Sequence, residues 1–134
     1  MSKQIKLIIP QVPLSINKTR VMHWAKLRKV KKLWVDEVWV AFHLAKRSFD
    51  FPLSLPLKKA DVSIKIFFRT NAHRDADNYP CKEVIDAIKN NGLIVDDDYE
   101  HIGKTDIDIT GRDKEHPRTE ITIEEITDAK NKIR

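Results

Sequence analysis

Aspartate side chains gather at two points in this sequence. The first is the run Arg-Asp-Ala-Asp-Asn at residues 74–78, and the second is the run of three aspartates at residues 96–98. Carboxylates at close range repel one another, and a divalent cation removes that repulsion. Hard oxygen ligands favour Mg²⁺ or Mn²⁺. These residue types therefore predict a metal centre.

The spacing predicts which carboxylates share the ion. Asp75 and Asp77 are two residues apart, so in extended chain their side chains point the same way. The second run joins them if Leu93 to Val95 runs back beside a strand that ends at Arg69. We expect that meeting. The candidate metal ligands are Asp75 and Asp77 together with one or more of Asp96, Asp97 and Asp98.

Such a centre can hydrolyse a phosphodiester bond, because bound metal activates water and neutralises charge on the leaving oxygen. Lys82, one turn into the following helix, can stabilise negative charge on phosphorus, and Arg74 can hold a phosphate. Structural roles compete with these. Asp77 or Asn78 can be a helix N-cap, residues 96–98 can form a solvated turn, and Lys82 can face solvent.

Residues 17–34 form a basic segment that contains no acid. A nucleic-acid backbone is its natural partner. The alternative is a solvated helix face whose apolar side enters the core, and we expect Trp24 and Trp34 to pack there rather than stack on bases. The predicted DNA-binding residues are Arg74, Lys18, Arg20, Lys26, Arg28, Lys29 and Lys32.

The whole chain has 134 residues and a formal net charge of +5. That length predicts a single domain, residues 1–134, with a frayed tail at residues 127–134. Cys81 is the only cysteine, which excludes a disulfide within the chain and a thiol-rich zinc site. The sequence has neither a long apolar N-terminal run nor a spanning segment, so we expect a cytoplasmic protein.

The hydrophobic pattern predicts an α/β (α+β) fold. A small mixed sheet is expected to be packed by a long N-terminal helix and a short central helix. Pro80 fits the first turn of that central helix, and Asn90-Asn91-Gly92 ends it. Residues 13–23 read as a loop, and residues 49–56 as a connection. The predicted strands are residues 4–9, 61–69, 104–110 and 119–126, and the long helix is residues 24–47.

The motif around the aspartates resembles that of the RusA-type Holliday junction resolvases, small endonucleases of bacteria and their phages. The resemblance rests on residues 74–78, Lys82, Asp86-Ala87 and residues 92–97, about a quarter of the chain. It implies a homodimeric nuclease that cuts four-way DNA junctions symmetrically, with one Mg²⁺ or Mn²⁺ site per subunit. The essential residues would be Asp75, Asp77, Asp97 and Lys82, with Arg74 contacting DNA, and Asp96 and Asp98 stay open as the third ligand.

The sequence therefore predicts a Mg²⁺-dependent, structure-selective endodeoxyribonuclease that resolves Holliday junctions in recombination and repair. Its expected partners are branched DNA and a second copy of the chain, with no membrane and no organic cofactor. One alternative is a metal-dependent nuclease for other branched DNA. Others are a DNA-binding protein without catalysis and a structural dimer whose acid patch answers a basic patch on a partner.

Overall fold

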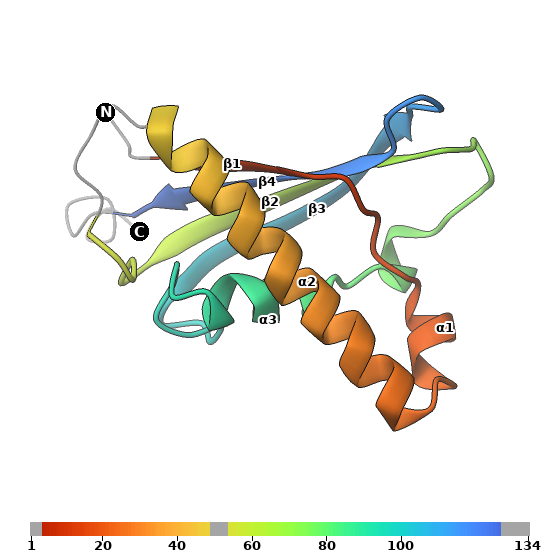
Figure 1. The fold of residues 1–134 in the computed structure, drawn as a ribbon, viewed down its shortest axis with the longest axis horizontal. Coiled ribbons are helices and arrows are strands. Elements are labelled where there is room, and N and C mark those ends of the chain that lie inside the picture. Colours follow the sequence, from red (N-terminus) through yellow and green to blue (C-terminus); the bar gives the residue numbers. More distant parts are fainter. Residues whose placement is uncertain (1–3, 49–53, 127–134) are drawn as a thin grey trace.

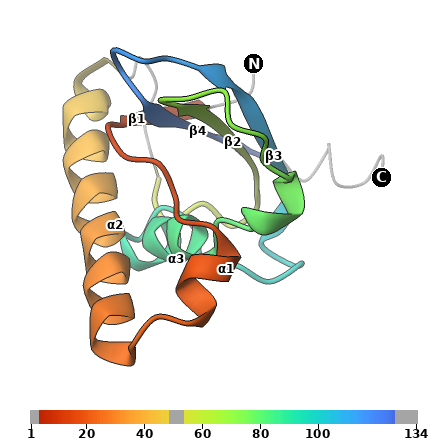
Figure 2. The ribbon, with the colours of Figure 1, turned by 90° about the vertical axis from the view of Figure 1, so that its right-hand side faces the viewer.

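The computed structural model describes residues 4–48 and 54–126, which form one sheet with α-helices on one face (Figures 1 and 2). This confirms the predicted α/β fold. The elements in chain order are β1 (Gln4–Ile9), α1 (Ile16–Arg20), α2 (Trp24–Ala45), η1 (Lys46–Ser48), β2 (Ala60–Phe68), η2 (Ala76–Asn78), α3 (Lys82–Asn90), β3 (Ile102–Arg112) and β4 (Arg118–Glu125).

The sheet is mixed, as predicted, and its strand order is β1-β4-β2-β3. β4 pairs antiparallel with both β1 and β2. β2 and β3 pair in parallel, with Ala60 opposite Ile102 at one end and Phe68 opposite Arg112 at the other. A parallel pair requires a crossover connection, and α3 lies within that connection. The two predicted acid groups therefore lie in the two halves of this crossover: residues 74–78 between β2 and α3, and residues 96–98 between α3 and β3.

Alternation along β2 separates a buried face from a partly exposed one. Val62, Ile64, Ile66 and Phe68 are buried, while Lys65 on the opposite face is exposed. α2 and α3 cover the buried face (Figure 2), and α2 contains the buried side chains Trp34, Val38 and Ala41. This apolar layer is the core of the domain.

α3 begins later than the sequence suggests, and Pro80 is not part of its first turn. The N-cap is Cys81, which is buried and left-handed, with φ 55° and ψ 36°. That conformation interrupts the helical path, so the helix starts at Lys82. Because Cys81 is the N-cap of α3, neither Asp77 nor Asn78 has the N-cap role that the sequence allowed for them.

The predicted stop of α3 is confirmed. Gly92 has φ 73°, and its N–H donates to Lys89 O while the N–H of Leu93 donates to Ile88 O, which together form a Schellman cap. The Asn91 amide donates to Val35 O of α2 at 3.0 Å and to Ala87 O at 2.8 Å. The end of α3 is therefore tied to α2.

The N-terminal half differs from the prediction in two details. The expected loop 13–23 contains α1, whose N-cap Ser15 accepts a hydrogen bond from Lys18 N. A helix of five residues is too short for hydrophobic periodicity to reveal. The long helix ends at Ala45 rather than Arg47 and continues as η1. Residues 49–53 of the predicted connection and the predicted tail 127–134 lie outside the described residues.

Candidate metal and nucleic-acid site

The segment between β2 and α3 is organised by Arg74. Its guanidinium donates to Thr70 O, Ala72 O and Thr70 Oγ1, each at 3.0 Å. The same group lies over the Phe68 ring, 3.9 Å from the ring centroid. Because the loop uses both terminal nitrogens of Arg74, this side chain fixes the backbone that carries Asp75.

Asp75 and Asp77, the η2 pair, lie at the single turn η2. The backbone oxygen of Asp75 accepts from Asn78 N at 3.0 Å, which closes the turn. The Asp75 carboxylate is 70% exposed, and its contact is with His73 Nε2 at 3.4 Å. Asp77 is exposed, and within the described residues its carboxylate has no hydrogen bond or ion pair. The η2 pair therefore keeps its oxygen lone pairs available to a ligand.

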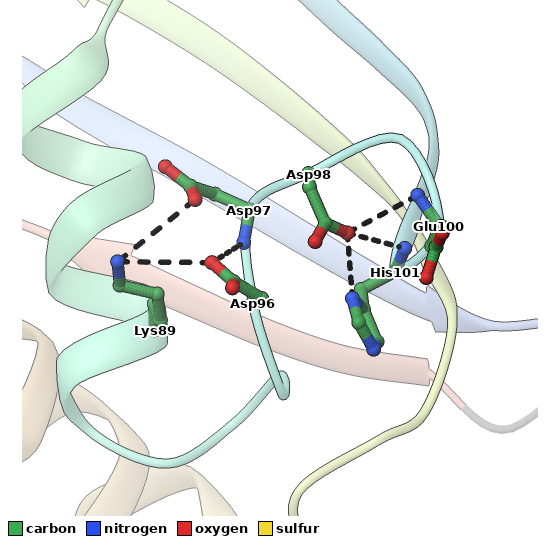
Figure 3. Close-up of polar contacts among 6 residues, drawn as sticks. All are labelled: Lys89, Asp96, Asp97, Asp98, Glu100 and His101. Carbon is green, nitrogen blue, oxygen red and sulfur yellow. Dashed lines mark hydrogen bonds and ion pairs between the residues drawn. The ribbon is translucent and has the colours of Figure 1, made fainter.

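Asp96, Asp97 and Asp98, the turn cluster, are bonded differently (Figure 3). Asp98 Oδ1 accepts from Glu100 N and His101 N at 3.1 Å, and lies 2.6 Å from His101 Nδ1. Asp96 Oδ1 accepts from Asp97 N at 2.7 Å. One carboxylate oxygen of Asp96 and one of Asp98 thus help to build the turn, as the solvated-turn alternative requires.

A lysine at the end of α3 partly offsets the charge of the turn cluster. Lys89 Nζ lies 3.8 Å from Asp96 Oδ1 and 3.9 Å from Asp97 Oδ1 (Figure 3). The hydrogen bond that Asp96 accepts from the backbone N–H of Asp97 is the main cause that lowers the pKa of the Asp96 carboxyl, and the nearby charges of Lys89 and His101 add to that effect. Asp97 makes the fewest bonds of the three.

The two acid groups do not meet within one chain. Leu93 to Val95 does not run back beside the end of β2, because Ile94 pairs with Leu57, ahead of β2. The green segment with η2 and the teal segment of the turn cluster lie at opposite ends of α3 (Figure 1), a helix of nine residues that spans roughly 13 Å. Across residues 4–48 and 54–126, no three His, Cys, Asp or Glu side chains could hold one metal ion.

Lys82 is exposed at the first position of α3. In the described parts of the chain it forms no ion pair with the η2 pair. It lines a pocket of about 290 Å³ with Arg20 of α1 and Lys31 of α2. Glu83 lines the same pocket; its Oε1 is buried without a hydrogen-bond partner among the described residues, and burial raises the pKa of its carboxyl. Lys82 therefore extends the basic surface of α1 and α2.

That basic surface contains all the lysines and arginines predicted to bind DNA except Arg74, which lies in the segment between β2 and α3. Lys18, Arg20, Lys26, Arg28, Lys29 and Lys32 are all exposed on α1 or the first half of α2. Trp34 packs in the core as predicted, but the same prediction is wrong for Trp24, which is 64% exposed. Trp24 begins α2, ahead of the turns that pack on the sheet, and Arg28 lies over its ring at 5.0 Å.

Comparisons with known proteins add no relative: no family model matches the sequence, and no curated protein matches it. Within the described residues, no helix is both long enough and apolar enough to span a bilayer.

Proposed function

We propose that this protein is a Mg²⁺-dependent endodeoxyribonuclease that resolves four-way DNA junctions by paired nicks. The observation that carries the proposal is the η2 pair, two exposed carboxylates that form no ion pair with a lysine or arginine of the described residues, on a chain of net charge +5. The pair follows directly on Arg74 in the chain. Carboxylates beside a phosphate backbone repel it unless a cation lies between them. An acid pair on a basic surface therefore suits a metal-dependent reaction on DNA.

The donor set suits Mg²⁺. The η2 pair supplies the hard oxygen atoms that this ion prefers. In the turn cluster, three groups contact Asp98 Oδ1, whereas the Asp97 carboxylate has Lys89 at 3.9 Å and its neighbour Asp96. We therefore assign Asp97 as the third ligand, with Asp96 beside it. Bound Mg²⁺ would supply an activated water and neutralise the leaving oxygen.

Since α3 separates Asp97 from the η2 pair of its own chain, the proposal requires a second copy. A two-fold axis that brings Asp97 of one copy to the η2 pair of the other also completes the reciprocal site. The homodimer then has two equivalent composite sites. Two equivalent sites match the chemistry of resolution, which needs one nick in each of two opposed strands.

The basic surface supplies the DNA track. We place the phosphate backbone along α1 and the first half of α2, where the cations are exposed. Lys82 lines a pocket with Arg20 and Lys31 of this track and follows η2 closely in the chain. It would stabilise negative charge developing on phosphorus. We extend the proposal to a cytoplasmic location, where a protein that acts on recombining DNA would meet its substrate in a cell without a nucleus.

A synthetic four-way junction with Mg²⁺ tests the activity. Wild type should release paired nicked products, and Asp75→Asn should abolish nicking while junction binding in a gel shift stays intact or tightens, because a negative charge near DNA is lost. Asp106→Asn, an equal charge change at an exposed position on β3, is the control and should nick normally. Wild type that does not nick the junction would end the proposal.

Mixed subunits test the composite site. Asp75→Asn and Asp97→Asn should each be inactive alone. After denaturation and joint refolding, a mixed dimer regains one intact site, so the mixture should recover about a quarter of the wild-type sites. If each site lay within one chain, every site would lack an aspartate and no activity would return.

A further inference from the structure

A pocket of about 370 Å³ is lined in part by Arg74 and Tyr79, the residues that flank η2 and its two aspartates in the chain. This volume lies in the range of small-ligand sites, about 300–1,000 Å³. The pocket is lined by the segment leading into α1, by the end of β2 and by the segment between β2 and α3. Its lining residues are Val12, Pro13, Leu14, Ser15, Lys18, Phe68, Arg69, Thr70, Arg74, Tyr79 and Pro117.

The cations of this pocket are not neutralised. Lys18 and Arg69 are exposed, and no carboxylate of the described residues forms an ion pair with either. Arg118 on the same sheet shows the opposite arrangement, since it is paired with Asp113 and Glu120 at 2.7 Å each. The pocket contains no acidic side chain. An anionic group is therefore the favoured occupant of its rim.

One wall of the pocket is made of aromatic rings and a guanidinium. Phe68 and Tyr79 meet edge to face with centroids 5.2 Å apart, and the Arg74 guanidinium is fixed over the Phe68 ring. Among the described residues, the Tyr79 hydroxyl has no hydrogen-bond partner. Aromatic rings and guanidinium planes are the surfaces on which unstacked bases stack in nucleic-acid complexes.

We infer that this pocket binds one nucleotide that leaves the base stack at the branch point of the DNA. The base would lie against Tyr79 and the Arg74 plane, and Lys18 and Arg69 would hold its phosphate. Arg74 immediately precedes Asp75 in the chain, so the captured nucleotide would present its backbone to the η2 pair. This inference rests on the proposed junction nuclease and names the part of the substrate that its site recognises.

Abasic junctions test the inference. Binding is measured by fluorescence anisotropy with Ca²⁺ replacing Mg²⁺, for an intact junction and for junctions lacking one base at each branch-point position. Wild type should bind one of the abasic junctions about tenfold more weakly, the scale of one lost stacking contact. Tyr79→Leu should bind the intact and abasic junctions equally, whereas Tyr79→Phe should restore the difference.

A substitution of Arg69 tests whether the charged rim of the pocket, Lys18 and Arg69, binds phosphate. Arg69→Gln should weaken binding to all these junctions alike and lower the slope of log affinity against log salt by about 0.9, the effect of one lost phosphate contact. Lys104→Gln, an equal charge loss in a separate pocket at the other end of β2, is the matched control and should leave both the affinity and its salt slope unchanged. Leu14→Glu, which places a carboxylate in the pocket outside every helix and strand, replaces Tyr79→Leu if that variant does not fold.

Two failures can be told apart. Wild type that binds and nicks the junction but binds intact and abasic forms equally would overturn the nucleotide pocket alone, as would retained discrimination by Tyr79→Leu. Wild type that neither binds a four-way junction more tightly than duplex DNA nor nicks it would overturn the proposed function and the pocket together.

Discussion

The η2 pair and the turn cluster both consist of aspartates, but the two groups differ in how many hydrogen bonds their carboxylates accept. In the turn cluster, Asp98 accepts two backbone N–H groups and the His101 ring, and Asp96 accepts a third N–H. In the η2 pair, one carboxylate has a single histidine contact at 3.4 Å. The loop around the η2 pair is held instead by Arg74 and Thr70. Carboxylates that do not have to maintain a turn remain available to bind.

The comparison separates two uses of aspartate. A carboxylate that accepts hydrogen bonds from nearby N–H groups stabilises the local backbone, because removing it leaves those N–H groups without an acceptor in the protein. A carboxylate whose backbone is held by other groups can be replaced without loss of stability. Substitutions at the two acid groups should therefore change different quantities.

The largest effect is expected from Asp77→Asn. Junction cleavage should fall by about a thousandfold or more, because several kcal/mol of transition-state stabilisation depend on the proposed ion. The melting temperature should stay unchanged, since this side chain bonds to no other described residue. Single-turnover cleavage rates and thermal melts measure the two quantities. A variant that loses both activity and stability would show that Asp77 maintains the fold, and the contrast between the two acid groups would disappear.

An intermediate effect is expected from Asp98→Ala. The three contacts of Asp98 Oδ1 resemble a capping arrangement, so unfolding in urea should show a loss of about 1–2 kcal/mol. Asp77→Ala is the control and should cost less than about 0.5 kcal/mol, as exposed substitutions do. Equal losses at the two positions would break the comparison.

The smallest effect concerns Asp96 and pH. Its pKa is lowered in the folded chain from the ordinary value of 3.8, so the folded state favours the ionised form. Its contribution to stability is present above pH 3.8 and is lost as the pH falls through the lower, folded value. Thermal melts of wild type and Asp96→Asn should differ slightly at neutral pH and converge in acid. A difference that grows as the pH falls would reverse this assignment.

Local sequence signals predicted most of the fold. Alternation placed β2 within one residue of its observed bounds, because one face of that strand is buried. Asn91-Gly92 marked the end of α3, since only a residue that tolerates positive φ closes that cap. α1 escaped prediction because five residues show no periodicity. The left-handed Cys81 also escaped, because nothing in the local sequence demands that backbone in a cysteine.

For the candidate site, too, the sequence indicated some features and left others undecided. The residue types alone indicated carboxylate ligands for a hard cation and a basic surface for DNA. They could not show which tryptophan is buried, since Trp24 and Trp34 share a helix but only Trp34 reaches the core. They also could not show that Arg74 is committed to its own loop.

The amino-acid sequence by itself determined the donor chemistry, the charge balance and the periods of the helices and strands, because each follows from residue type and near-neighbour spacing. Tertiary structure alone decided that the η2 pair and the turn cluster lie at opposite ends of α3 and that Lys18 and Arg69 line one pocket. The pairing of Ile94 with Leu57 sets the first arrangement. Such contacts join residues distant in the chain, and packing of the whole core selects among the many pairings that local pattern allows.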